Sequence, residues 1–110
     1  MNERRKARRY NLSLPIVFRI RSDKESSTRN SRTRDVSTQG VYFTIEEALP
    51  AGTALDVVLT LPSNAAGPSA LVRAICRVVR VDTGSSRDYA AAVIENYAFV
   101  REETGKINLS

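Results

Sequence analysis

The chain has 110 residues, of which 42% are hydrophobic and 26% charged, enough for one small globular domain with a modest core. No stretch approaches the ~20 consecutive apolar residues of a membrane-spanning helix. Charged residues crowd the first nine positions, and no apolar run of the kind found in signal peptides follows them. We therefore expect a cytoplasmic protein that does not insert into a membrane.

The side chains available for catalysis are few. The chain has no histidine and a single cysteine, Cys76, which excludes an intramolecular disulfide, histidine-based triads and the usual zinc sites. Cys76 lies in an apolar run and is predicted to be a small buried residue. No pair of carboxylates suggests acid–base catalysis. The sequence therefore predicts a protein that is not an enzyme and has neither a metal site nor a cofactor.

Positive charge is concentrated at the start of the chain. Residues 1–34 contain eleven basic and three acidic residues, whereas residues 35–110 contain six basic and nine acidic ones. This asymmetry indicates a site for an anion. Arginine outnumbers lysine by fourteen to three. Because a guanidinium can both fork onto a phosphate and stack on a flat ring, this bias favours a nucleotide.

Six short strands are expected along the chain. Residues 1–9 are polar and lack apolar periodicity, so they are predicted to form a flexible basic arm. From Tyr10 to Ile20 apolar and polar residues alternate, which is typical of a strand with one buried face. Pro15 indicates an edge or a bulge there, because proline has no N–H to donate. The remaining strands are a short one leading into Asp35 and Val36, and runs at 41–45, 55–61, 71–81 and 89–94.

The end of the chain is expected to be helical. Asn96 fits the cap of a short helix running to about Glu103, and residues 104–110 are predicted to form a frayed tail. Short strands at this spacing, with a helix only at the end, indicate an all-β fold. We predict a six-stranded antiparallel β-barrel, built as a meander, in one domain over residues 10–103.

Two segments carry chemistry beyond the strand pattern. Residues 4–9, Arg-Arg-Lys-Ala-Arg-Arg, precede the first strand. By itself such a run indicates a solvated tail or a nucleic-acid-binding arm. Residues 35–40, Asp-Val-Ser-Thr-Gln-Gly, lie between two strands. By themselves they indicate a turn, because Asp, Ser and Gly each favour turns for local reasons.

In this order and on this strand pattern, the two segments resemble the motifs of the PilZ family. That family carries an RxxxR motif ahead of the first strand and a (D/N)xSxxG motif after the second. The first is matched by Arg5 and Arg9, and the second by Asp35, Ser37 and Gly40. The resemblance extends over most of the chain, including the entry to the barrel and two of the later strands.

The resemblance implies a receptor for cyclic di-GMP, a compact dianion with two guanines. Arg5 and Arg9 would reach this ligand together, by forking onto phosphate oxygens or stacking on a guanine. Asp35 would accept hydrogen bonds from the guanine N1–H and exocyclic amine. Ser37 would offer its hydroxyl to phosphate or base, and Gly40 would permit a tight turn or a close approach of the ligand.

Arg4 stands immediately before the RxxxR motif. In the family this position is associated with the choice between one bound ligand and an intercalated pair, and arginine points to the pair. The alternative is a spare solvated arginine. One and two ligands per chain therefore both stay open, as do a monomer and a dimer.

The last strand departs from the family pattern. Where the family commonly has a Gly-x-x-Phe-like segment, this chain has Ala91-Ala92-Val93-Ile94. Alanine in place of glycine is expected to narrow the space beside the barrel surface, and Ile94 replaces an aromatic core residue.

The resemblance also implies a mechanism and a partner. The basic arm is expected to become ordered over the barrel when the ligand binds, at an entropic cost of ~1–2 kcal/mol per residue fixed. The new surface formed by arm, ligand and barrel would then engage a downstream protein that the sequence does not identify.

Two alternatives stay open. The first is a small β-barrel that binds RNA or single-stranded DNA through its basic arm. Such proteins expose aromatic residues for base stacking, whereas most of the three Phe and four Tyr fall at core positions of the strand pattern, which argues against a nucleic-acid partner. The second is a degenerate PilZ domain that binds no nucleotide and acts only as a protein adaptor, against which the intact motif residues argue.

Overall fold

The computed structural model describes residues 9–23, 27–62 and 70–100, and the regular structure of these residues is β-strand throughout. No helix in this part of the chain is long and apolar enough to cross a membrane. The strands agree with the six predicted ones, apart from the start of the first and the end of the last. They are β1 (Pro15–Ile20), β2 (Arg29–Val36), β3 (Gly40–Ile45), β4 (Ala54–Leu61), β5 (Ala70–Thr83) and β6 (Asp88–Val100).

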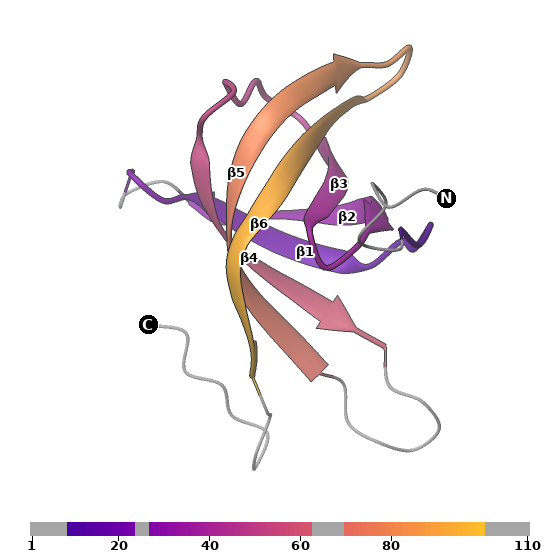
Figure 1. Cartoon of the computed structure of the whole chain (residues 1–110). Coiled ribbons are helices and arrows are strands. Elements are labelled where there is room, and N and C mark those ends of the chain that lie inside the picture. Colours follow the sequence, from indigo (N-terminus) through magenta and orange to yellow (C-terminus); the bar gives the residue numbers. More distant parts are fainter. Residues whose placement is uncertain (1–8, 24–26, 63–69, 101–110) are drawn as a thin grey trace, which may run out of the picture.

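The strands close into one antiparallel barrel in the order β1-β2-β3-β6-β5-β4, with β4 pairing back onto β1 (Figure 1). The predicted six-stranded antiparallel barrel is therefore confirmed. The predicted meander is wrong at one connection, because β3 pairs with β6 and the chain crosses from β3 to β4 beside β1. This arrangement joins two three-stranded meanders along both of their edges, which leaves neither edge unpaired.

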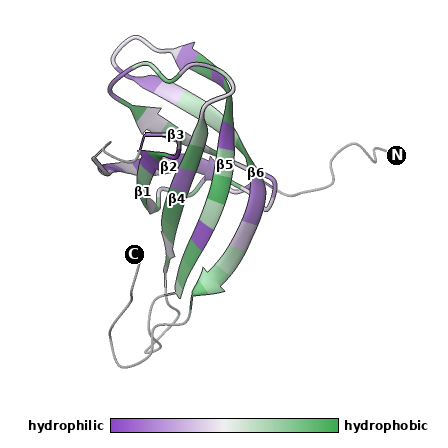
Figure 2. Cartoon of the chain, turned by 90° about the vertical axis from the view of Figure 1, so that its left-hand side faces the viewer, coloured by the Kyte–Doolittle hydropathy of each residue, from purple (hydrophilic) through white to green (hydrophobic). Residues whose placement is uncertain are grey.

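Alternating side chains fill the barrel. In β3, Val41, Phe43 and Ile45 are buried, whereas Tyr42 between them is half-exposed. The burial of side chains alternates in the same way in β4 and in β5 as far as Val78. In Figure 2 these two strands are mostly green, interrupted by purple bands. Near the centre the rings of Phe18 and Phe43 lie 5.1 Å apart. The period-two pattern of the sequence therefore translates directly into an inner and an outer face.

Cys76 lies in this core, as predicted, with no exposed surface. Burial raises the pKa of its thiol to about 12. Because the thiolate is the reactive form of cysteine, the folded protein keeps this side chain inert at neutral pH.

The chain enters the barrel alongside β2. Tyr10 and Val36 exchange two backbone hydrogen bonds, of 2.9 and 3.0 Å. The buried hydroxyl of Thr33 accepts a hydrogen bond from the N–H of Leu14 and donates one to the carbonyl oxygen of Leu12. The strand predicted from Tyr10 therefore begins only at Pro15, the first residue of β1, where a strand tolerates a missing N–H.

The end of β6 contradicts a prediction. The helix expected from Asn96 is wrong as far as Val100, since these residues continue the strand; residues 101–103 lie outside the described part. Asn96 pairs with Ile75 and Val100 with Leu71. Because β5 is long enough to offer every one of these residues a partner, the ladder outweighs the local capping signal. Residues 1–8 of the predicted arm and the predicted tail at 104–110 also lie outside the described residues.

Candidate functional site

A hollow with a volume of about 460 Å³ lies on the outer face of the barrel, over the β3–β6 pair. Four predicted site residues line it, and these are the predicted site residues that the structure describes: Arg9, Asp35, Ser37 and Gly40. Arg4 and Arg5 lie outside the described residues. The other lining residues are Arg34, Val36, Val41, Tyr42, Val79, Arg80, Ala91, Ala92 and Val93.

An extra residue in β2 turns Asp35 toward the hollow. The β2–β3 register shifts so that Thr33 lies opposite Phe43 but Asp35 lies opposite Tyr42. Directly opposed residues share one face of a sheet. Thr33 therefore faces the core with Phe43, and Asp35 faces outward with Tyr42. Without this bulge at Arg34, strict alternation would have turned the Asp35 carboxylate toward the core.

The chain entry brings Arg9 to the same place. Because Tyr10 forms an antiparallel bridge with Val36, Arg9 enters next to the 35–40 segment, and its side chain reaches Asp35, with Nη2 3.5 Å from Oδ2. The Asp35 side chain is 12% exposed, whereas that of Arg9 is 70% exposed. Ion pairs with so exposed a partner contribute at most about 1 kcal/mol. The guanidinium can therefore turn to a bound anion at little cost.

Ser37 organises the turn between β2 and β3. Its Oγ accepts hydrogen bonds from the N–H groups of Gln39 and Gly40, at 3.0 and 3.2 Å. The Ser37 N–H donates to the Gly40 carbonyl at 2.9 Å. A turn is thus present, but it is shorter than the predicted 35–40, because Asp35 belongs to β2 and Gly40 to β3. The hydroxyl hydrogen of Ser37 keeps its capacity to be donated, because both of these side-chain bonds use the oxygen as acceptor.

Gly40 is required for space. A Cβ at this position would stand 2.9 Å from the carbonyl oxygen of Ala92, closer than real side chains approach a backbone. The left-handed backbone conformation is not the reason, since among the described glycines the positive φ belongs to Gly52. Gly40 lets β3 and β6 lie close together at the floor of the hollow.

The floor continues on β6 with small side chains. Ala91 lies opposite Tyr42 on one side and Arg80 on the other, so it stands between two large residues of neighbouring strands. Ala92 points into the core and is buried, and Ile94 packs against the core from a partly buried position. The alanine that stands at the position of the family's glycine therefore lines the hollow, between two much larger side chains.

Sequence reasoning missed a cluster of large polar and aromatic side chains at the rim. The rings of Tyr42 and Tyr89 stack 5.1 Å apart, and the guanidinium of Arg34 lies over both, at 5.9 and 5.4 Å from their centroids. Arg80 lies over Tyr42 at 5.8 Å. Arg34 directly precedes the motif aspartate, and this adjacency was the available signal. The position of Arg80 depends on a bulge in β5, which the sequence pattern does not predict.

One short hydrogen bond fixes this cluster. The Tyr42 hydroxyl donates to Asp82 Oδ2 at 2.6 Å. This bond, with burial and the charge of Asp82, raises the pKa of Tyr42. The same hydrogen bond, together with that from Arg80, lowers the pKa of Asp82. Asp82 is therefore a carboxylate, and Tyr42 a neutral phenol, over the whole physiological range.

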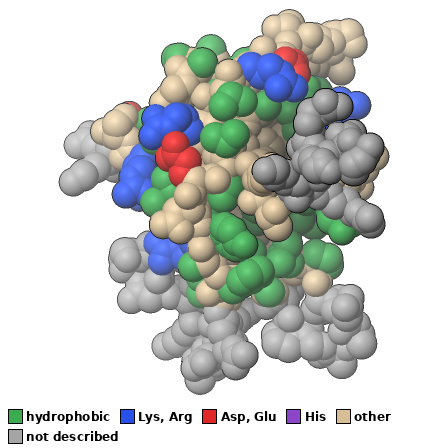
Figure 3. Space-filling view, in the orientation of Figure 1, with side chains coloured by type: hydrophobic (Ala, Val, Ile, Leu, Met, Phe, Trp, Pro, Cys, Tyr) green, Lys and Arg blue, Asp and Glu red, His purple; other side chains and the backbone are tan. Residues whose placement is uncertain are grey.

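The prediction that most aromatics lie in the core is wrong. Phe18 and Phe43 are buried, but the other five described aromatics lie on the outside or at half-exposed positions. Tyr97 and Phe99 are 46% and 66% exposed near the end of β6. Hydrophobic side chains gather in the lower half of Figure 3, where β6 and β4 run in Figure 1. The error arises because β3 pairs with β6 only over 88–93, so that in the described part of the chain the end of β6 pairs with β5 alone.

Fold and hollow together define a class of protein: a small closed β-barrel domain with an arginine- and aspartate-lined hollow on its outer surface. The model of the PilZ domain matches residues 3–99, nearly the whole chain. The chain therefore belongs to the PilZ domain family, which confirms the resemblance that the two motifs suggested.

A comparison with solved structures agrees on the fold. The chain is similar to the inhibitor of motility MotI/DgrA of Bacillus subtilis, with a TM-score of 0.76 and 14% sequence identity. The match covers 88% of this chain but 45% of that chain, so this chain spans less than half the length of MotI/DgrA. At this identity the similarity shows the shared fold alone. No curated protein matches the sequence.

Proposed function

We propose that the protein is a receptor for cyclic di-GMP that transmits the binding event to a partner protein in the cytoplasm. One observation carries the proposal: Arg9, from the first motif, lines the same hollow as Asp35, Ser37 and Gly40, from the second. Membership of the PilZ domain family supports it independently.

The geometry suits a guanine nucleotide with negative charge. Asp35 is a largely buried acceptor at the wall of the hollow, suited to the N1–H and amine of guanine. Ser37 can donate its hydroxyl hydrogen to a phosphate oxygen. Arg9, with Arg5 and Arg4 from the preceding residues, would supply charge-assisted bonds to phosphate or stack on a base.

Ligand binding would rearrange the chain entry. In the free protein Arg9 lies 3.5 Å from Asp35. A guanine on Asp35 would displace this guanidinium, which would then turn to the phosphates. The relocated residues 1–9 and the ligand together would form the surface that the partner protein reads.

Nucleic-acid binding is the second candidate, and exposed aromatics favour it. Tyr97 and Phe99 lie edge to face, 6.1 Å apart, on the exposed end of β6. Aromatic pairs of this kind serve as stacking platforms for single strands. Their surface lies on β6 beyond the hollow, so the two functions are separable by experiment.

Calorimetric titration of the full chain tests the proposal, with cyclic di-GMP as ligand and with GTP and a short oligonucleotide as controls. We expect saturable binding of cyclic di-GMP alone, weakened about tenfold or more in Arg9→Ala by the loss of charge-assisted bonds. Arg21→Ala is the matched control, because Arg21 pairs with Asp56 on the β1–β4 wall, away from the hollow. Binding of the oligonucleotide in its place, or equal effects of the two substitutions, would refute the proposal.

A further inference from the structure

A single row of side chains crosses the hollow. Successive cross-strand partners are Asp35 on β2, Tyr42 on β3, Ala91 on β6 and Arg80 on β5. Directly opposed residues share a face of the sheet, so this row lies on the outer face throughout. Three interstrand spacings of about 4.8 Å separate its ends, roughly 14 Å along the sheet. The motif residues occupy one end of the row, and Arg80 occupies the other.

A second bulge sets the direction of Arg80. The β5–β6 register shifts so that Val78 lies opposite Ala92 but Arg80 lies opposite Ala91. Val78 and Ala92 are buried in the core, whereas Val79 and Arg80 face outward. Strict alternation from Val78 would have placed Arg80 on the inner face. The bulge of β5 therefore turns Arg80 to the outer face, as the bulge of β2 turns Asp35 to it.

Arg80 is held in a defined orientation. Its Nε donates to both carboxylate oxygens of Asp82, at 3.1 and 3.3 Å. Its guanidinium carbon Cζ lies over the ring of Tyr42, 5.8 Å from the centroid. The side chain is nevertheless 61% exposed and lines the hollow. A guanidinium that is held by a ring and a carboxylate, yet stays largely exposed to the hollow, is available to a second flat ring.

We propose that Arg80 is a further ligand-binding residue, which stacks on the second purine base of a cyclic dinucleotide whose first base is bound at Asp35. The inference rests on the proposed function and extends it across the hollow. A ligand with one base would contact only the Asp35 end of the row, whereas a ligand with two bases would contact both Asp35 and Arg80.

The contacts of Arg80 favour a base over a phosphate as its partner. The carboxylate of Asp82 already balances its charge, which reduces its attraction for an anion. Stacking depends instead on the flat guanidinium and on its position over the Tyr42 ring. Tyr42 and Asp82 are thus positioning residues, and Arg80 is the residue that touches the ligand.

The experiment is a calorimetric titration of the full chain with cyclic di-GMP in four forms: unsubstituted, Arg80→Ala, Arg80→Lys and Arg21→Ala. We expect Arg80→Ala to weaken binding about tenfold, the size of one cation–π contact. Arg80→Lys should be nearly as weak, because lysine keeps the charge but has no flat surface. Arg21→Ala should bind as the unsubstituted chain does. Thermal melting of each form checks that the barrel is folded.

The outcomes separate the two proposals. If the unsubstituted chain binds cyclic di-GMP and Arg80→Ala binds equally well, the role of Arg80 is refuted and the receptor function stands. If Arg80→Lys restores full affinity, Arg80 acts as a charge and stacking is refuted. If the unsubstituted, folded chain does not bind, the receptor function fails and this inference fails with it.

Discussion

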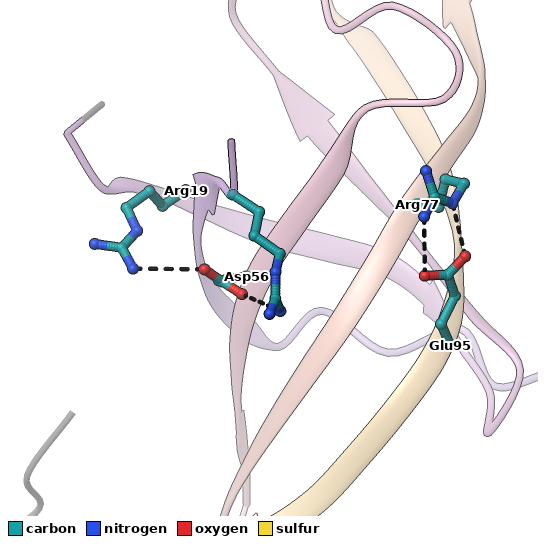
Figure 4. Close-up of polar contacts among 5 residues, drawn as sticks. Arg19, Asp56, Arg77 and Glu95 are labelled. Atoms are coloured by element: carbon teal, nitrogen blue, oxygen red, sulfur yellow. Dashed lines mark hydrogen bonds and ion pairs between the residues drawn. The ribbon is translucent and has the colours of Figure 1, made fainter. Parts of the chain in front are cut away.

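Arginine–aspartate ion pairs lie on two walls of the barrel, the β1–β4 wall and the wall with the hollow. The two walls differ in the exposure of the aspartate and in the regularity of the strand pairing. On the β1–β4 wall, Asp56 lies 3.4 Å from Arg19 and 3.1 Å from Arg21, and all three side chains are exposed (Figure 4). On the wall with the hollow, Arg9 lies beside an Asp35 side chain that is 12% exposed. The β1–β4 ladder is regular, whereas the ladders that flank the hollow contain bulges.

The comparison of the two walls indicates that an ion pair alone does not identify a ligand-binding site. Exposed pairs such as those of Asp56 contribute little to stability. The bulges of β2 and β5 instead bring side chains that would face inward to the outer face. With small residues on β3 and β6 between them, these side chains enclose a space. Irregular pairing, more than charge, distinguishes the wall with the hollow from the regular β1–β4 wall.

Replacing the aspartate of each wall, Asp35 or Asp56, should give the largest difference in ligand affinity between the two walls. We expect Asp35→Ala to weaken cyclic di-GMP binding about 100-fold, because two charge-assisted hydrogen bonds to guanine would be lost. Asp56→Ala should leave the affinity unchanged. Calorimetric titration of both variants measures the contrast. Equal affinities of the two variants would show that the hollow is not the binding site.

Adding a methyl group to each wall tests the packing. In Gly40→Ala the new Cβ would meet the Ala92 carbonyl oxygen at 2.9 Å, so β3 and β6 must separate, at a cost of about 1–3 kcal/mol in the free energy of unfolding. Val17→Ile, on the half-exposed face of β1, should change it by less than about 0.5 kcal/mol. Urea unfolding monitored by circular dichroism measures both. An unchanged midpoint for Gly40→Ala would mean that the close approach of β3 and β6 is not obligatory.

The smallest effect is expected at the rim of the hollow. Tyr42→Phe removes the hydroxyl that donates to Asp82, and we expect a loss of stability below that of Gly40→Ala. The pKa of Asp82 is lowered by folding, so its contribution is present above the ordinary pKa and is lost as the pH falls through the folded value. In Tyr42→Phe the carboxylate should titrate at higher pH, as carbon-detected NMR would show. An unchanged titration would assign the lowered pKa to Arg80 alone.

Much of the barrel could be predicted from the sequence, because β1, β3 and β4 carry an apolar residue at every second position. The motif positions Arg9, Asp35, Ser37 and Gly40 could be predicted as well, and the structure places them together. The direction of Arg80 could not be predicted. In the run from Val78 to Val81 no alternation identifies the extra residue, and only pairing with β6 determines which residue is unopposed.

The errors at the end of the chain have the same origin. Asn96 is a good local helix cap, but it is also a residue with a partner available on β5. Tyr97 and Phe99 alternate like core residues, yet the barrel does not extend far enough to cover them. Local preference and periodicity specify a face of a strand. They do not specify how far the neighbouring strands run, which is a property of the whole sheet.

The bridge between Tyr10 and Val36 fixes the start of the chain to the barrel beside the hollow. The number of residues before Tyr10 therefore limits how far each preceding arginine can lie from the hollow. Two backbone hydrogen bonds anchor Tyr10 one residue away from Asp35. Arg5 stands four residues before Arg9, so covalent geometry keeps it within about 14 Å of that arginine. Its effective concentration at the hollow is therefore set by the length of this segment and not by the amount of protein in the cell. Sequence added before residue 1 would leave this concentration nearly unchanged, whereas residues inserted between the arginines and Tyr10 would dilute it.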